Sequence, residues 1–238
     1  MCSKIKLAPR ECLEALRCEY RRNSRVQIKN ILKVDSAQRI YRSLSTQTQW
    51  NLAWNLDGRH QDMDYTAVQE WTEAEKRKLD DLIYRQASHG FQYRFSAVPI
   101  YDIYQNNLLP GHFFNSIYEF LNSEELLTLA RTVTGFEQIR FADVQATRYS
   151  KGHFLNEHDD HVVGKNRLAA YVLNLTPKWK PDWGGSLTFP DENGHAVTWF
   201  PTFNAINIFT VPQKHAVTIV SPFAPESRYS LTGWFRSA

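Results

Sequence analysis

The sequence predicts an α+β fold in which a mainly helical first part supports a mainly β core formed by the second part. Of the 238 residues, 42% are apolar, which suits one domain with a core of ordinary size. Near residue 140, helical periodicity gives way to at least seven short β-rich runs separated by turn residues, a pattern typical of a sandwich, a jelly roll or a barrel. We expect a single domain over 1–238, with helical support and the first strands in about 1–140 and the β core in about 141–238.

Four helices are predicted in the first part from apolar spacing and from the residues that begin and end helices. Segments 9–22 and 35–48 have the helical period, and Asp35 or Ser36 is a candidate N-cap of the second. Thr72, followed three residues later by a glutamate, opens a third helix that runs towards Gly90. The fourth begins after Ser123 and is expected to end at Gly135, a typical C-terminal glycine.

The strands of the second part are predicted from runs of β-branched and aromatic residues bounded by Gly, Pro, Asn and Asp. The predicted strands are Val144–Tyr149, Leu168–Leu175, Ser186–Phe189, Ala196–Phe200, Ala205–Thr210, Ala216–Val220 and Tyr229–Phe235. No internal repeat or low-complexity linker interrupts the chain, so we expect the helices to pack on one β core.

Positive charge is concentrated at the start of the chain. Residues 1–42 contain 11 Lys and Arg against 4 Asp and Glu, a balance of +7 in a chain whose net charge is +3. Such a segment could bind nucleic acid. However, its charges alternate with apolar residues at near-helical spacing, and no aromatic residue interrupts the basic run at 21–25 as a stacking platform. We therefore favour a solvated helix face, and nucleic acid is not an expected partner.

Two features favour a reduced, cytoplasmic protein without a membrane partner. No apolar stretch reaches the roughly 18 to 20 residues that a spanning helix needs, and the N-terminus lacks the continuous apolar stretch of a secretory signal. The cysteines Cys2, Cys12 and Cys18 have no close Cys-x-x-Cys pair, which disfavours a metal knuckle.

The segment around His158 is the strongest candidate for a chemical site. In an extended strand, side chains two residues apart share a face, so His158 and Asp160 can offer an imidazole and a carboxylate to one ion. His215 precedes a later predicted strand that a jelly roll can fold back beside the first pair. Two histidines and one carboxylate form the facial triad of non-haem Fe(II) oxygenases, which leaves positions open for other ligands.

Other histidines are weaker candidates. A His-x-Asp pair also occurs by chance, and Asp159 with His161 lies on the opposite face of such a strand, where it can face solvent. His153 has the wrong strand parity to join His158. The remaining histidines have no partner at useful spacing and are predicted to be structural: His60, His89, His112 and His195.

The last predicted strand adds a charge that such a site can use. Strand alternation places Arg228, Thr232 and Trp234 on one face together with Ser230. An arginine inside a β core needs an anion, and its guanidinium matches a carboxylate through two parallel charge-assisted hydrogen bonds. A dicarboxylate that meets Arg228 at one end and the metal at the other would fill the space between them, and 2-oxoglutarate has that shape. A surface ion pair is the alternative for this arginine.

These residues together resemble the 2-oxoglutarate- and Fe(II)-dependent dioxygenases, and in particular their prolyl 4-hydroxylase branch. The similarity covers roughly residues 100–238. The positions that carry it are Tyr149, Gly152 to Leu155, His158, Asp160, Arg167, Asn174 to Trp179, Gly184 to Leu187, His215 and Arg228 to Trp234.

The resemblance implies a double-stranded β-helix, or jelly roll, with helices packed on one sheet. It implies that His158, Asp160 and His215 hold iron and that Arg228 binds the distal carboxylate of 2-oxoglutarate. Tyr149, Thr232 and Trp234 match positions near this co-substrate. Asn174 stands where some prolyl hydroxylases have a co-substrate-binding tyrosine, and this is the chain's departure from the pattern.

The implied reaction consumes dioxygen and 2-oxoglutarate at Fe(II), hydroxylates the substrate and releases succinate and carbon dioxide, with ascorbate as a candidate reductant. A prolyl residue of a protein or peptide is the first substrate candidate, under a lid from 57–65 or 86–104. A free amino acid or other small metabolite is the alternative. A non-catalytic jelly-roll module that binds metal and a partner is the alternative of another class. Nucleic-acid demethylases of this superfamily have a second arginine where this chain has Trp234, so a nucleic-acid substrate is disfavoured.

Overall fold

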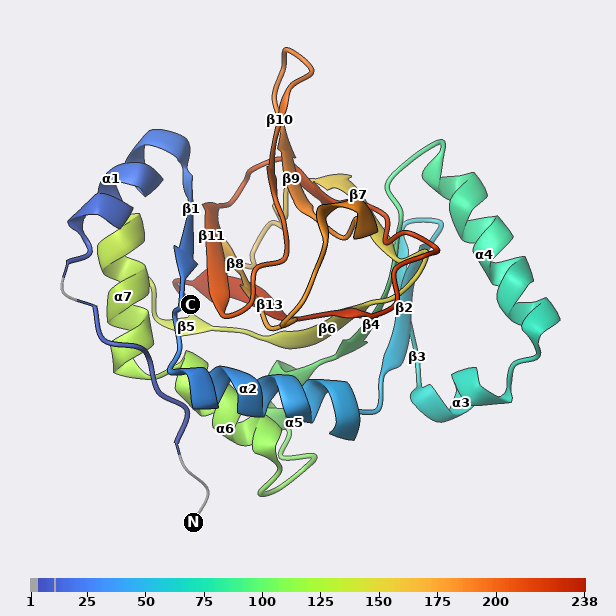
Figure 1. The fold of residues 1–238 in the computed structure, drawn as a ribbon, viewed down its shortest axis with the longest axis horizontal. Coiled ribbons are helices and arrows are strands. Elements are labelled where there is room, and N and C mark those ends of the chain that lie inside the picture. The colour runs from blue at the N-terminus through green and yellow to red at the C-terminus, as the bar shows by residue number, and fades with distance from the viewer. Residues whose placement is uncertain (1–3, 11) are drawn as a thin grey trace.

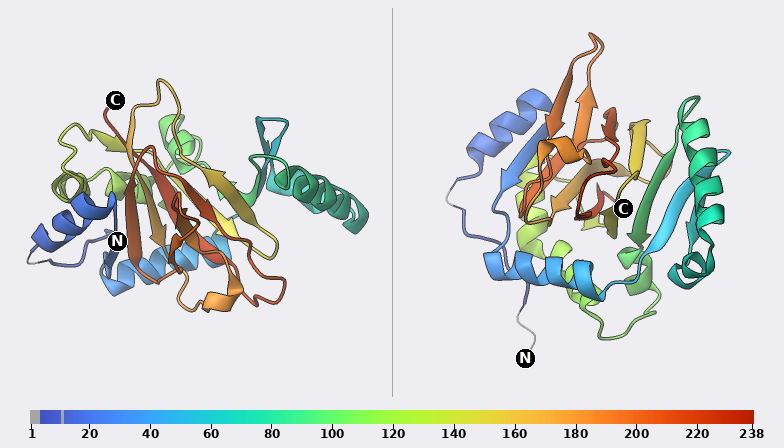
Figure 2. Two further views of the ribbon diagram at one scale, coloured as in Figure 1. Left: turned by 90° about the horizontal axis from the view of Figure 1, so that it is seen from above. Right: turned by 45° about the vertical axis from the view of Figure 1, so that its right-hand side comes forward.

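The structure, a computed structural model, describes residues 4–10 and 12–238 and contains a long antiparallel sheet that curls on itself (Figures 1 and 2). Cys2 therefore lies outside the described residues, and Cys12 and Cys18 are exposed free thiols. The α-helices are α1 (Glu14–Asn23), α2 (Val34–Arg42), α3 (Tyr65–Glu70), α4 (Glu73–Ala87), α5 (Ile100–Gln105), α6 (Phe113–Leu121) and α7 (Glu124–Thr134).

The strands are distributed over both parts of the chain. They are β1 (Arg25–Lys29), β2 (Asn51–Leu56), β3 (Arg59–Met63), β4 (Tyr93–Val98), β5 (Phe141–Ala142), β6 (Gln145–Tyr149), β7 (Phe154–His158), β8 (Arg167–Asn174), β9 (Leu187–Pro190), β10 (Ala196–Trp199), β11 (Ala205–Thr210), β12 (His215–Val217) and β13 (Arg228–Arg236). The predicted strands of the second part are thus confirmed within a few residues, although β12 is shorter than expected.

The sheet order explains how a cavity forms. Strands β1-β11-β8-β13-β6-β4 form one half, and β7-β12-β9-β10 form the other, with β4 pairing both β6 and β7 at the fold between them. The two halves face each other as the double-stranded β-helix that was predicted. The main apolar core lies outside this curl, where α2, α6 and α7 cover the longer half, and a second helical group, α3 and α4, packs beside β2 and β4 (Figure 1).

Helix ends follow local chemistry where that chemistry is strong. The Thr72 hydroxyl accepts a hydrogen bond from the Glu75 amide, and the Glu75 carboxylate accepts one from the Thr72 amide. Helix α4 therefore begins with a capping box. Ser123 caps α7, and Gly135 ends it at a φ of 76°. The predicted starts of these helices and the end of α7 are therefore confirmed.

The first two predicted helices begin elsewhere than expected. α1 begins at Glu14, and α2 follows Lys33, so neither Asp35 nor Ser36 is an N-cap. Ser36 instead accepts a hydrogen bond from the Lys6 amide with its hydroxyl at 3.1 Å. A tertiary contact with the chain before α1 has replaced the local cap.

The first part contributes more strands than the sequence indicates. β4 is a central strand of the curl, paired with β2, β6 and β7. The prediction that 86–104 forms a lid is therefore wrong for this strand, because its main-chain groups are committed to the sheet. Within the described residues, no helix combines the length and the apolar composition needed to cross a membrane.

Candidate active site

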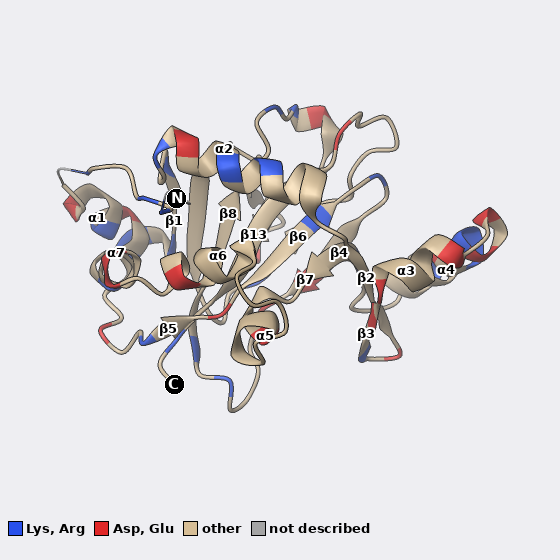
Figure 3. Cartoon of the chain, turned by 90° about the horizontal axis from the view of Figure 1, so that it is seen from below, with Lys and Arg blue, Asp and Glu red and all other residues tan. Residues whose placement is uncertain are grey.

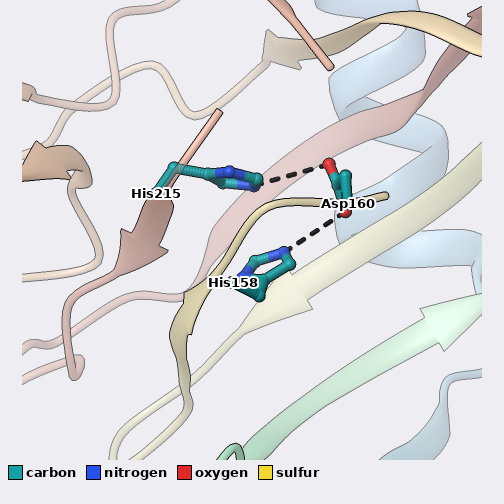
Figure 4. A group of neighbouring side chains, drawn as sticks. All are labelled: His158, Asp160 and His215. Atoms are coloured by element: carbon teal, nitrogen blue, oxygen red, sulfur yellow. Dashed lines mark ion pairs between the residues drawn. The ribbon is translucent and has the colours of Figure 1, made fainter. Parts of the chain in front are cut away.

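Three side chains converge at one end of the cavity inside the curl (Figure 4). His158 ends β7 and His215 begins β12, and the two residues are direct partners across these strands, with ring centroids 4.1 Å apart. The Asp160 carboxylate reaches both, with Oδ1 3.3 Å from His158 Nε2 and Oδ2 3.5 Å from His215 Nε2. One ligand atom from each residue lies within 4.8 Å of the other two.

The route by which Asp160 reaches this position differs from the prediction. β7 ends at His158, so strand alternation does not place the carboxylate. Asp160 has a left-handed backbone with a φ of 63°, which aspartate tolerates better than most residues. Its carbonyl accepts a hydrogen bond from Arg167 Nη1 at 2.9 Å. A turn therefore brings Asp160 to His158, while Asp159 and His161 are exposed as expected.

Both imidazoles are oriented by the main chain. His158 Nδ1 lies 2.9 Å from the carbonyl oxygen of Asn156, and His215 Nδ1 lies 2.8 Å from that of Gln213. Because a carbonyl oxygen only accepts, each Nδ1 donates and must carry a proton. In the neutral ring, Nε2 then keeps its lone pair on the side of Asp160, which is the arrangement of a metal-binding histidine.

The electrostatics of this group favour a bound cation. Burial alone would raise the pKa of Asp160, but its hydrogen bond to His158 and the charge of His215 outweigh burial and lower that pKa. Burial opposes the charged form of His158, yet Asp160 more than offsets this and raises its pKa, whereas burial dominates at His215 and lowers the pKa there. An ionised carboxylate that faces two imidazole nitrogens is a donor set suited to a divalent transition metal.

Arg228 lies in the same cavity, whose volume is about 540 Å³. Its buried guanidinium donates from Nη1 to the Gly185 carbonyl at 2.7 Å and from Nη2 to Asn174 Oδ1 at 3.3 Å, and lies over the Tyr149 ring. Burial lowers the pKa of Arg228 to about 10. No carboxylate pairs with it in the described part of the chain, and Nε has no hydrogen-bond partner there. A buried cation in this state calls for an anion.

The other predicted co-substrate residues divide into two groups. Tyr149, Thr232 and Trp234 line the cavity, and the buried Thr232 hydroxyl has no hydrogen-bond partner among the described residues. Asn174 does not line the cavity, because its side chain lies behind Arg228 and bonds to it. The structure therefore shows Asn174 as a hydrogen-bond partner of the arginine and not as a lining residue, which differs from the co-substrate contact expected at this position.

The glycine pair before β9 permits close packing around Arg228. Gly184 and Gly185 have φ values of 69° and 63°, which disfavour any residue with a side chain. A Cβ at Gly184 would collide with the carbonyl oxygen of Ile219, and one at Gly185 would lie 3.2 Å from side-chain atoms of Trp179 and Val220 beside Arg228. The glycine pair therefore permits a close approach of the backbone to its neighbours.

His60, which was predicted to be structural, lines the cavity, and its Nδ1 lies 2.6 Å from the Tyr93 hydroxyl. The signal that could have placed it is the pair Asp57 and Gly58, which connects β2 and β3 as a tight hairpin. Tyr93 and Phe91 also line the cavity and were missed because β4 was not recognised as a strand.

The residues of the cavity fit a metal ion together with a dicarboxylate. They present two imidazoles and a carboxylate that converge on one point. In the same cavity they present an arginine without an acidic partner and a hydroxyl without any partner among the described residues.

Comparisons with known proteins agree with this geometry. The family model of the 2OG-Fe(II) oxygenase superfamily matches residues 144–236. A curated relative, "Prolyl 3-hydroxylase OGFOD1" of Mus musculus, is 29% identical over 110 residues, which are 43% of this chain and 20% of the relative. The chain thus matches about a fifth of the length of that relative.

Solved structures establish the fold. A prolyl-4-hydroxylase of Pseudomonas putida superposes with a TM-score of 0.61 at 18% identity, over 95% of this chain and 100% of that one. A Trichoplax adhaerens prolyl hydroxylase in complex with a hypoxia inducible factor peptide fragment superposes with a TM-score of 0.63 at 16% identity, over 94% of this chain and 89% of that one. Taken with the matched segment, these findings confirm the predicted resemblance: residues 144–236 are similar to the 2OG-Fe(II) oxygenase superfamily, and the chain shares its fold with solved prolyl hydroxylases.

Proposed function

We propose that this chain is an Fe(II)- and 2-oxoglutarate-dependent dioxygenase that hydroxylates a prolyl residue of a protein or peptide and releases succinate and carbon dioxide. The observation that carries the proposal is the pairing, within one cavity, of the donor set His158, Asp160 and His215 with the unpaired guanidinium of Arg228. In the balanced reaction, one oxygen atom of dioxygen enters the substrate C–H bond. The other enters succinate as 2-oxoglutarate loses carbon dioxide.

Each residue has a defined task in this proposal. His158, Asp160 and His215 hold Fe(II), which supplies the activation of dioxygen when bound. Arg228 binds the distal carboxylate of 2-oxoglutarate, and the Thr232 hydroxyl donates a hydrogen bond to the same group. Tyr149 covers the guanidinium with its ring, which excludes water from the charge pair.

The mouth of the cavity favours a peptide over a free amino acid. Phe91 and Val162 both line the cavity, yet each is 46% exposed, and the Phe91 ring lies 5.4 Å from that of His158. Apolar side chains at a wet entrance can contact a pyrrolidine ring and the residues beside it. The peptide in the Trichoplax adhaerens complex gives further support for a protein or peptide substrate.

The test measures succinate and product together. Anaerobically purified protein would receive Fe(II), 2-oxoglutarate and ascorbate, then oxygen, with a panel of proline-containing peptides, and mass spectrometry would follow succinate and a product heavier by one oxygen atom. We expect both to form and to require His158, whereas His195→Ala, at an exposed histidine that does not line the cavity, serves as the matched control. Omission of ascorbate is expected to shorten the period of turnover.

Other outcomes assign the other candidates. Hydroxylation of free amino acids but not of peptides would favour the metabolite enzyme. Iron binding without succinate, across the whole panel, would favour a non-catalytic metal-binding module and would contradict the proposal.

A further inference from the structure

A second cavity, of about 440 Å³, lies behind the candidate active site on the outer face of the curled sheet. It is enclosed by β4 and β6, by α3 and the start of α4, and by the segment 224–227 that precedes β13. In Figure 3, α3 and α4 stand apart from the helices that cover the rest of the sheet. None of the tasks proposed above involves this cavity.

Strand alternation assigns alternate residues of β4 and β6 to the two cavities. Tyr93 and Thr147 face the candidate active site, whereas Arg94, Ser96 and Arg148 line the rear cavity. Ser96 and Arg148 are direct partners across the two strands, and Arg148 Nη2 donates to Ser96 Oγ at 3.2 Å. The rear cavity is thus built on the same rigid strands as the front cavity.

Arg148 is the one cation of the rear cavity that is both partly buried and without an acidic partner. Its guanidinium lies over the Trp50 ring, 5.3 Å from the centroid, and its buried Nε has no hydrogen-bond partner among the described residues. No described carboxylate forms an ion pair with it. Burial lowers the pKa of Arg148, which shows that water stabilises this charge less than in solution.

The charges of the rear cavity leave an excess of one positive charge. Lys76 and Arg94 line it but pair with Glu73 and with Asp80, both at 2.9 Å. The other charged lining residues are Arg148 and the exposed Lys151 and Glu226, which carry opposite charges that cancel in the sum but form no ion pair in the described structure, so the uncompensated charge equals that of Arg148. The buried His153 adds no charge, since burial and the two neighbouring guanidinium groups lower its pKa to about 3.

The remaining walls are apolar and aromatic. Trp50 and Leu52 line the cavity from the sheet side, Val68 and Trp71 from α3 and the turn after it, and Leu79 from α4. A volume of this size lies within the range of small-molecule sites. An occupant therefore meets apolar walls and one uncompensated guanidinium, whose planar edge matches a carboxylate.

We propose that the rear cavity binds a small organic monocarboxylate that has an apolar or aromatic body. The carboxylate pairs with the edge of the Arg148 guanidinium, and the body packs between Trp50 and the side chains of α3 and α4. A single carboxylate matches the single excess charge, whereas a phosphate dianion would be left partly unpaired. This ligand site is independent of the proposed hydroxylation.

The test uses indole-3-acetate as the probe and its neutral amide as the matched ligand. Titration calorimetry on the full chain, with Mn(II) and 2-oxoglutarate present to fill the front cavity, is expected to show one site for the acid. The amide should bind at least about tenfold more weakly, because a hydrogen bond to a charged group is lost. Arg148→Gln should weaken the binding of the acid by the same factor while leaving the binding of the amide unchanged.

Two further variants keep the test decisive. Val68→Trp fills the rear cavity from α3 without changing any charge, and it should abolish binding of both probes in a protein that unfolds at the wild-type temperature. Arg228→Gln should leave the probe bound. Absence of binding in the wild type, persistence of binding in Arg148→Gln, loss of binding in Arg228→Gln alone, or displacement of the probe by equimolar inorganic phosphate would each overturn the proposal.

Discussion

Two arginines on neighbouring strands occupy opposite faces of the same sheet. Arg228 begins β13 opposite Tyr149, and Arg148 lies one position away in β6, opposite Tyr229. The front arginine is fully enclosed and held by Gly185 and Asn174. The rear arginine has one hydrogen bond to a side chain, that of Ser96, and lies on a tryptophan ring.

This difference separates a preorganised site from an adaptable one. Arg228 needs little reorganisation to receive a carboxylate, and the cavity that holds it also contains the metal donor set. Arg148 faces a cavity beside the short helix α3, where charge and apolar contact are the proposed means of holding a ligand. Position in the strand, rather than residue type, therefore decides which chemistry each arginine serves.

Removal of a metal ligand is expected to separate the two faces most strongly. Asp160→Ala takes away the carboxylate that faces both imidazoles, so metal binding and succinate formation should both be lost, since even changes in outer contacts of a metal site cost about 10- to 100-fold. The rear cavity should still bind its probe. Asp62→Ala, at an exposed carboxylate that does not line the cavity, is the control and should retain metal by calorimetry.

Arg228→Gln is expected to have the next largest effect. Loss of one partner of a buried charge pair costs about 2 to 5 kcal/mol, so the KM for 2-oxoglutarate should rise by roughly 30- to 5000-fold while Fe(II) affinity is retained. Steady-state succinate assays and separate metal titration measure the two quantities. Equal loss of both ligands would contradict the assigned role. Arg148→Gln, on the other face, should leave the KM for 2-oxoglutarate as in the wild type.

His153 tests the burial of the rear face through the pH dependence of stability. Its folded-state pKa of about 3 lies below the ordinary value of 6.5, so the stability it contributes is fully present above about pH 6.5 and is lost as pH falls towards 3. Between pH 7 and pH 5, His153→Gln should lose about 2 kcal/mol less unfolding free energy than the wild type. Urea unfolding at both pH values measures this, with the exposed His161→Gln as control. The same dependence of the unfolding free energy on pH in the wild type and in His153→Gln would refute this assignment.

Asn174→Ala is expected to have the smallest effect. The variant removes one hydrogen bond that orients Arg228, a contribution of about 0.5 to 1.5 kcal/mol, so the KM for 2-oxoglutarate should rise about 2- to 13-fold with kcat little changed. An effect as large as that of Arg228→Gln would show that Asn174 binds the co-substrate directly.

The sequence predicted the elements whose signals are local or follow strand alternation. Ser123 and Gly135 define α7 through capping, and the register of β13 places Arg228 and Thr232 on the inner face as expected. The spacing of His158, Asp160 and His215 also identified residues that the structure brings together. These features depend on few residues that are close in sequence or on a regular period of two.

Features that depend on residues distant in the sequence could not be predicted from local patterns. Asp160 reaches His158 through a left-handed turn held by Arg167, so the expected convergence of these side chains is present although strand alternation does not produce it. β4 is a strand because β2, β6 and β7 pair with it, and without it neither the place of His60 nor the rear cavity could be foreseen.

The most direct test of the account is a crystal structure of the chain with Mn(II) and 2-oxoglutarate, grown without oxygen turnover. The account predicts one metal ion bound to His158 Nε2, Asp160 and His215 Nε2, and the distal carboxylate of 2-oxoglutarate on the Arg228 guanidinium. A metal ion bound elsewhere, or 2-oxoglutarate found away from Arg228, would contradict it.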